Sequence, residues 1–178
     1  MVHHVLKVAV LCSETPIIGD EPETAKAKIA ESASMDFLKD HWAYNEEELI
    51  RLLDICFGWK AGGELESGGY SRDVIFVTGD IHCGVSSIVR DQETGLQINH
   101  LVTSPVTNHV CKFFPALQGS IDGGRYTFSH LPLGESFRNY ADIGIRILED
   151  EEVSVQAQLV PISTDIFKDK SWKQGSAE

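Results

Sequence analysis

Two polar residues, Asp80 and His82, follow directly after a run of apolar, mostly β-branched residues that begins at Asp73. Such a run predicts a buried strand, and Gly79 marks its end. A carboxylate without a partner is too costly to leave inside a core, so Asp80 and His82 belong at the carboxyl edge of the strand. At that edge the two side chains are suited to bind a metal ion, with His82 as a ligand and Asp80 as a ligand or as the group that orients the imidazole.

The same residues also have a purely structural interpretation. Asp80 then caps backbone amides in a turn, and His82 is a histidine satisfied by its neighbours. Cys83 follows in the chain and is interpreted as a core thiol, since free cysteine is among the most buried residue types. A cysteine hydrolase that uses Cys83 with His82 is disfavoured, because adjacent residues after a strand point to opposite sides.

Four other residues are weighed as candidates for contacts with a substrate. Asn108, after the Ser104-Pro105 break, is the candidate substrate-binding residue, and its alternative is a turn asparagine bonded to its own backbone. Trp42 and Tyr44 either line a pocket or form a hydrophobic staple in front of a helix, and the structural interpretation is favoured. Arg138 is expected to be solvated. No role is assigned to His100 or His130, because their spacing indicates no partner.

Composition limits the classes of protein that fit. The 178 residues, of which 42% are hydrophobic, suit one domain over residues 1–168 with a polar tail over 169–178. A formal charge of −12 makes nucleic acid and an anionic membrane surface poor partners. The four cysteines form no CxxC pair, and no apolar run is long enough to cross a bilayer. We therefore expect a cytoplasmic protein.

The elements that must position these residues are predicted from periodicity and turn signals. Strands are expected at 5–11 and 73–77, a partial helix at 24–33, and an amphipathic helix that starts after Asn45 and ends at Gly58. Residues 62–69 are then a loop. Two hairpins follow, one from strands 85–89 and 96–102 and one from strands 142–148 and 153–160. The second hairpin places Ile143, Ile145 and Ile147 on one face. Residues 113–133 show no readable pattern.

Four segments in order resemble the carboxyl-terminal part of PhoD-like phosphatases, which belong to the calcineurin-like metallophosphoesterases. Val77 to His82 is similar to the Gly-Asp-Val-His motif of that family, and Asp40 to Asp54 is similar to its Trp and Tyr segment with the helix that follows. Leu101 to Asn108 resembles its next strand and Ser-Pro segment, and Arg138 to Ile143 resembles the entry to its final hairpin. The match runs from about Cys12 to Val160.

The resemblance implies a fold, a reaction and a cofactor. The fold is an α/β, metallophosphoesterase-type β-sandwich with flanking helices, present here as its mostly antiparallel carboxyl-terminal part. The reaction is hydrolysis of a small phosphate mono- or diester at two metal ions, divalent or of mixed valence, with Fe, Ca, Mn or Zn as candidates. Asp80 and His82 are then metal ligands and catalytic residues, and Asn108 binds substrate.

The chain also departs from the family pattern. The early acid, the upstream Gly-Asp segment and the Asn or Asp-Asp-His segment that supply most of the metal ligands are not found in it. We therefore expect this chain to correspond to the distal part of such an enzyme and to be inactive by itself. The alternative is a non-catalytic, β-rich interaction domain that keeps the fold without a full metal site.

Overall fold

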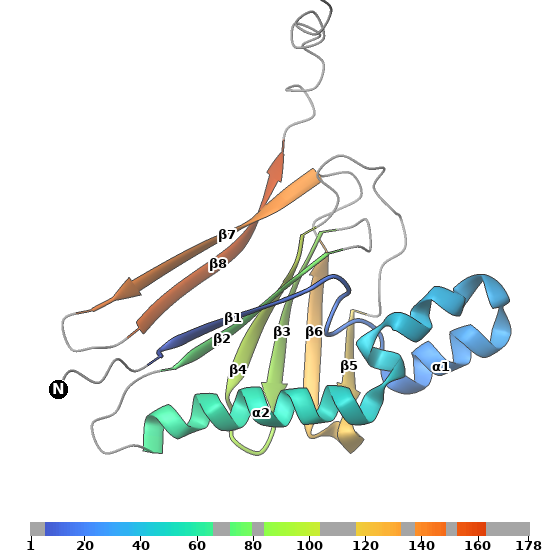
Figure 1. Cartoon of the computed structure of the whole chain (residues 1–178), viewed down its shortest axis with the longest axis horizontal. Helices are drawn as coiled ribbons and strands as arrows, with labels where there is room; N and C mark the ends of the chain where they lie inside the picture. Colours follow the sequence, from blue (N-terminus) through green and yellow to red (C-terminus); the bar gives the residue numbers. More distant parts are fainter. Residues whose placement is uncertain are drawn as a thin grey trace, which may run out of the picture.

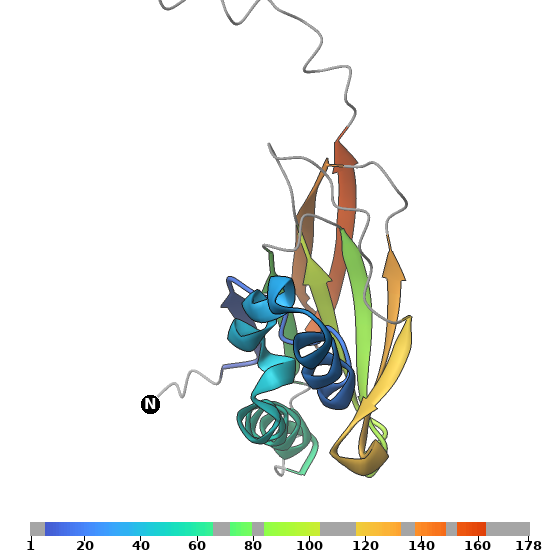
Figure 2. The same ribbon diagram turned by 90° about the vertical axis from the view of Figure 1, so that its right-hand side faces the viewer.

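The structure is a computed structural model that describes residues 6–65, 72–79, 84–103, 117–132, 138–148 and 153–162. Its helices pack on one face of a six-stranded sheet, and a two-stranded hairpin lies on the other (Figures 1 and 2). The elements in chain order are β1 (Val8–Ser13), α1 (Pro22–Glu31), η1 (Ala33–Asp40), η2 (Trp42–Tyr44), α2 (Glu46–Leu65), β2 (Asp73–Thr78), β3 (Val85–Asp91), β4 (Gln97–Val102), β5 (Gln118–Ile121), η3 (Asp122–Gly124), β6 (Tyr126–Pro132), β7 (Arg138–Ile147) and β8 (Val153–Ile162). The α/β class is confirmed.

The large sheet is mixed, with strand order β1-β2-β4-β3-β6-β5. Strands β1, β2 and β4 run parallel, whereas the pairs β4–β3, β3–β6 and β6–β5 are antiparallel. β2 is the buried strand that its apolar run predicts, and it lies between β1 and β4. β1 spans 8–13 rather than 5–11, because its register with β2 pairs Val8 with Asp73 and Ser13 with Thr78.

The hairpin β3–β4 confirms the prediction for residues 85–102. Its turn carries Gly95 at φ 74°, a left-handed conformation that glycine adopts at little cost. Strands β5 and β6 occupy the stretch without a readable pattern. They are joined by a tight turn in which Asp122, Gly123 and Gly124 all have positive φ. Because β5 has only four residues and the turn follows directly, the alternation of apolar and polar residues in β5 is too short to be recognised.

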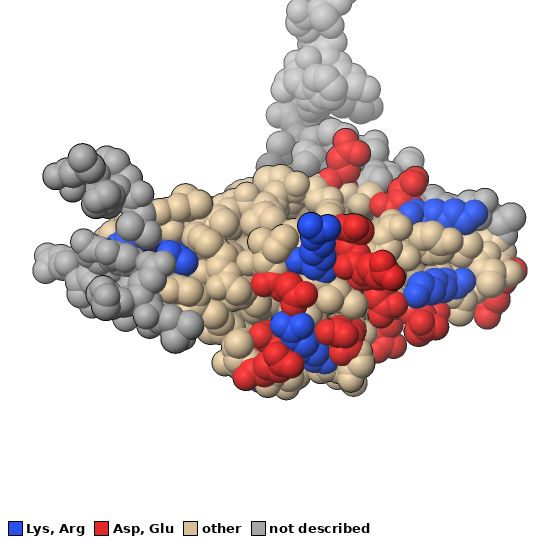
Figure 3. Space-filling model, turned by 60° about the horizontal axis from the view of Figure 1, so that its bottom comes forward, with Lys and Arg blue, Asp and Glu red and all other residues tan. Residues whose placement is uncertain are grey.

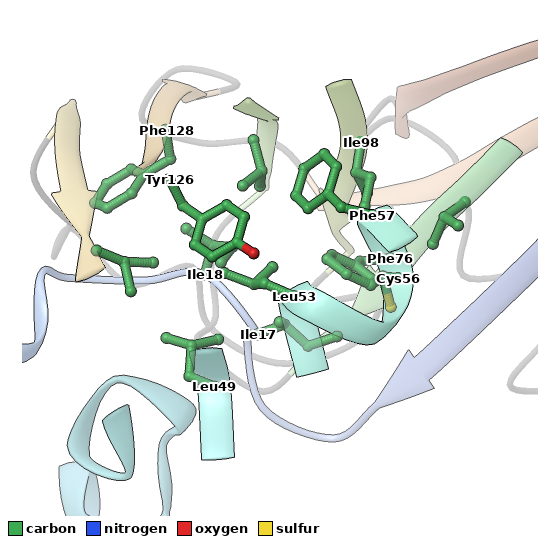
Figure 4. Packing of buried hydrophobic residues seen from close by; sticks show 13 residues of the cluster. Ile17, Ile18, Leu49, Leu53, Cys56, Phe57, Phe76, Ile98, Tyr126 and Phe128 are labelled. Atoms are coloured by element: carbon green, nitrogen blue, oxygen red, sulfur yellow. The ribbon is translucent and has the colours of Figure 1, made fainter. Parts of the chain in front are cut away.

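The core lies between α2 and the sheet (Figure 4). Leu49, Leu53 and Phe57 form the apolar stripe of α2, and each is at most 2% exposed. Phe57 stacks on Tyr126 of β6 with ring centroids 5.4 Å apart. Burying side chains of this size removes several hundred Å² of apolar surface from water, at roughly 25 cal/mol per Å². This packing fixes α2 across the sheet.

The prediction that Gly58 ends the helix is wrong, because α2 continues to Leu65. Glycine in a helix interior costs about 1 kcal/mol relative to alanine. Two contacts beyond it offset that cost: Trp59 packs against the core, and Lys60 forms an ion pair with Asp73 at the start of β2. Tertiary contacts therefore override the local signal.

Replacing Gly58 by alanine should stabilise the protein by about 0.5–1 kcal/mol, because the residue sits inside a helix. A Cβ at this position would meet no atom within 4 Å, so no clash opposes the gain. Urea unfolding followed by circular dichroism measures the change. Gly119→Ala is the opposing control, since its Cβ would lie 2.5 Å from Phe128 Cζ. A loss of stability in Gly58→Ala would contradict an uninterrupted α2.

The second hairpin, β7–β8, is longer than predicted and pairs Arg138 with Ile162 at its open end. It covers the sheet face opposite α2, where Ile75 and Leu101 are 0% and 1% exposed. Thr103 Oγ1 donates to the Asn139 carbonyl across this contact, at 3.5 Å. Towards its turn the hairpin extends beyond the sheet, so Ile147 remains 69% exposed. None of the described helices has the length and apolar character needed to cross a membrane.

Candidate functional site

The carboxyl ends of β1, β2 and β4 meet at one edge of the sheet. Thr103 N donates to the Thr78 carbonyl at 2.8 Å, and Gly79 N donates to the Glu14 carbonyl at 3.3 Å. A Cβ on Gly79 would lie 3.4 Å from the Thr103 carbonyl oxygen, an ordinary van der Waals contact, so the three strand ends come together here without requiring glycine. The chain that leaves β2 is thus held on both sides at the edge where parallel sheets commonly place ligand sites.

The residues predicted to act at this edge lie outside the described residues. This applies to Asp80 and His82, which follow Gly79, and to Asn108, and Cys83, which is expected to be a core thiol, lies outside them as well. Their assignments therefore stay predictions. Arg138 is described as the first residue of β7.

A pair of polar side chains lies directly below this edge, on the face that α2 covers. Thr78 Oγ1 and His100 Nε2 are 2.8 Å apart, and the two residues are 3% and 0% exposed. His100 also lies edge-on to Phe76, with ring centroids 6.1 Å apart. Within the described part of the chain, His100 Nδ1 is buried without a hydrogen-bond partner. The ring is thus anchored at one nitrogen only.

A second polar pair lies beside the first. Ser87 faces His100 across the β3–β4 ladder and His130 across the β3–β6 ladder. Ser87 Oγ lies 2.6 Å from His130 Nδ1, and His130 Nε2 lies 2.8 Å from the Gly19 carbonyl. Because a carbonyl only accepts, Nε2 carries the proton and Ser87 donates to Nδ1. We call Thr78, Ser87, His100 and His130 the polar row.

Burial keeps both imidazoles of the polar row neutral. Desolvation, together with the nearby His130, lowers the pKa of His100 to about 3. Desolvation also lowers the pKa of His130, although the Gly19 carbonyl and the Asp20 carboxylate oppose this shift. The polar row therefore carries no positive charge at neutral pH.

The Ser87–His130 contact has the geometry of a nucleophile with an adjacent base, oriented by a third group. Ser87 is only 1% exposed and lies in the middle of the sheet, and His130 is 6% exposed. A substrate atom has no path to the Ser87 oxygen in this arrangement. The contact instead joins β3, β6 and the segment that contains Gly19, and it satisfies polar groups inside the core.

Sequence reasoning assigned no role to His100 and His130, although strand alternation contained a usable signal. Ile98 and Val102 are buried, and His100 stands midway between them in β4. Tyr126 and Phe128 precede His130 with the same period of two. A histidine in phase with core residues is placed on the inner face. The alternation does not predict which residue of another strand becomes the hydrogen-bond partner of each histidine.

The segment before α2 has a structural role. Trp42 packs against the core, and its Nε1 donates to Ser13 Oγ at 3.3 Å. Tyr44, in contrast, is 37% exposed. These contacts support a structural rather than a pocket role for Trp42, which joins η2 to the end of β1. The described structure thus uses Trp42 to hold the helical layer against the sheet.

The described residues include no group of three or more His, Cys, Asp or Glu side chains arranged to hold a metal ion. They therefore do not form a metal cage by themselves. On the side of α2, Lys and Arg side chains lie among Asp and Glu side chains (Figure 3). Arg125, for example, contacts Asp54 at 2.8 Å and Glu93 at 3.4 Å. Basic charge on this face is matched by acidic charge nearby.

Comparisons of this chain with protein-family models, with curated proteins and with solved structures found no match.

Proposed function

We propose that this chain is the carboxyl-terminal part of a PhoD-like metallophosphoesterase. It would contribute one side of a site that hydrolyses small phosphate esters, with Asp80 and His82 as metal ligands and Asn108 as a substrate contact. The upstream motifs of the family would supply the other ligands. The observation that carries the proposal is the buried strand β2, which ends at Thr78, directly before Gly79, on an edge shared with two parallel neighbours.

The surroundings of that edge support the proposal in two ways. The Glu14 and Thr103 contacts hold the backbone of Gly79 and Thr78 at this edge. The polar row beneath it stays neutral, because burial lowers the pKa values of His100 and His130. A neutral support does not repel a cation, whereas two imidazolium groups near the edge would.

Metal ions would supply the Lewis acidity and the activated water of the reaction. The chain's own contribution, under this proposal, is to orient ligands rather than to move protons. The Thr78–His100 pair is buried and engaged, so it is suited to hold the end of β2 in place. The formal charge of −12 repels a negatively charged phosphate ester, so we expect binding to require a cation.

The 178-residue chain should show no hydrolysis of a chromogenic phosphomonoester or phosphodiester above the buffer rate, with Fe, Ca, Mn or Zn added. A protein extended by the coding sequence upstream of Met1 should hydrolyse one of the two if that sequence contains the missing motifs. His82→Ala should abolish this turnover, because it removes a ligand, and Cys12→Ser should not.

Two results would contradict the proposal in different ways. The 178-residue chain could bind stoichiometric metal and hydrolyse a phosphate ester, with both lost in His82→Ala. That result would show that the chain is a complete enzyme and would contradict the proposal that it is only the carboxyl-terminal part of one. An extended protein that folds and binds no metal would contradict the enzyme itself.

A non-catalytic interaction domain remains the second candidate, and a specific observation favours it. Ile145 and Ile147 of β7 are 47% and 69% exposed, and Tyr140 on the other face of this strand is 48% exposed. Apolar side chains in such a projecting hairpin are typical of surfaces that contact other proteins. An upstream coding sequence without metal-ligand motifs would favour this candidate.

A further inference from the structure

Strand β1 forms an open edge of the large sheet. It pairs with β2 on one side, and no described strand pairs with its other side. Asp73 N donates to the Lys7 carbonyl at 2.9 Å, so Ala9, Leu11 and Ser13 continue the parallel ladder. The alternate residues Val8, Val10 and Cys12 then direct their peptide groups away from β2. Among the described residues these groups have no backbone partner, so they form a row of donors and acceptors to which another strand can pair.

The composition of β1 leaves this edge unprotected. Natural edge strands commonly carry a lysine, a proline, an inward charge or a bulge that blocks pairing with another chain. Val8–Ser13 contains no charged residue and no proline, and its pairing with β2 is regular. Val10 is 43% exposed, and Cys12 is also exposed. The edge is therefore able to accept a further strand.

The opposite edge of the same sheet is blocked. β5 has only four residues, and Glu21 Oε1 accepts from Ser120 N at 2.8 Å and from Ser120 Oγ at 3.4 Å. The Glu21 side chain lies against the strand, since a Cβ on Gly119 would be 2.6 Å from Glu21 Cγ. A strand from another molecule would have to displace this carboxylate.

The difference between the two edges decides which assembly is possible. Pairing of β1 with β5 of another copy would repeat head to tail and form an open filament, and the Glu21 contact opposes it. Pairing of β1 with β1 of a second copy uses the same surface twice and closes at two molecules. In antiparallel pairing the outward residues become hydrogen-bonded pairs, with Val10 opposite Val10 and Val8 opposite Cys12.

We propose that the 178-residue chain forms a two-fold symmetric dimer in which the β1 strands of two copies pair antiparallel about Val10. The two large sheets become one continuous sheet. The Val10 side chains, on the face opposite α2, lie next to each other and are removed from water. The inference rests on the strand edges and not on phosphate ester chemistry. The oligomeric state tests the dimer, whereas metal content and hydrolysis test the proposed enzyme.

Sedimentation velocity from low to high micromolar concentration tests the dimer with variants that separate backbone from side chain. Val10→Pro removes an outward N–H and leaves the bonds from Ala9 and Leu11 to β2 in place. Val10→Ala shortens the side chain and keeps the N–H. We expect dimer for the wild type and for Val10→Ala, and monomer for Val10→Pro. Circular dichroism establishes that each variant is folded.

A second pair of variants keeps the test decisive if proline disturbs folding. Val10→Lys places a charge at the two-fold axis, and Ile88→Lys places the same charge at a position 41% exposed in β3, away from the edges. Dimer should be lost in the first and kept in the second. A monomeric wild type at high micromolar concentration would overturn the proposal. So would a dimer that survives in folded Val10→Pro or Val10→Lys, or one that Ile88→Lys abolishes equally.

Discussion

Replacing Phe57 by alanine should lower the free energy of unfolding by about 3–5 kcal/mol, the range for large aromatic residues in a core. Phe57 is 2% exposed, stacks on Tyr126 and lies where α2 contacts the sheet. The substitution removes apolar contacts and leaves a cavity that the rigid sheet cannot close. Alanine favours the helix, so the loss is attributable to packing rather than to helix propensity.

The same helix provides the matched control. Ile55 is 62% exposed on the outer face of α2, so Ile55→Ala should change stability by no more than about 0.5 kcal/mol. Urea unfolding monitored by circular dichroism measures both variants under the same conditions. Equal losses in Phe57→Ala and Ile55→Ala would show that α2 does not bury this face in solution.

Lowering the pH from 7 to 4.5 should destabilise the protein by about 2.5 kcal/mol through His100 alone. Burial lowers the pKa of His100 in the folded protein to about 3, whereas an exposed histidine has a pKa of about 6.5. Between these values the unfolded chain binds a proton that the folded chain does not. Stability is therefore full above about pH 6.5, falls as the pH decreases, and stops falling through this group near pH 3.

His130 should add to the loss in the same direction, because burial lowers its pKa as well. His100→Gln separates the histidine from the carboxylates that titrate in the same range. Its amide can still bond to Thr78, and it does not titrate. Urea unfolding at pH 7, 5.5 and 4.5 should give a flatter dependence for His100→Gln than for the wild type. Parallel curves for the two proteins would contradict the neutral, buried state of His100.

Much of the local structure follows from patterns within short segments. The apolar run from Val74 to Val77 predicts β2, and the polar turn that ends in Gly95 predicts the hairpin β3–β4. The stretch after Asn45 predicts the start of α2. Each of these signals is contained in about ten neighbouring residues, because strand and helix periods and turn residues act locally.

The candidate site could be predicted only in part. Periodicity predicts a buried strand that stops at Gly79, and the structure confirms this strand as β2, which ends at Thr78. Its position between β1 and β4 was not predicted. The roles of Asp80, His82 and Asn108 stay predictions. The polar row was not predicted, because a serine and a histidine 43 residues apart in sequence become neighbours only when β3 pairs with β6. Local composition does not predict which distant strands pair with each other.

The sequence by itself determined the α/β class, the position of the buried strand that ends at Gly79 and the start of the main helix. The tertiary structure decided where α2 ends, since the contacts of Trp59 and Lys60 outweigh the cost of Gly58. It also decided that burial lowers the pKa of His100 and that β1 lies at an edge of the sheet formed by the described strands. The physical reason is that burial, desolvation and strand order depend on which distant segments come together, whereas helix and strand propensities depend on near neighbours.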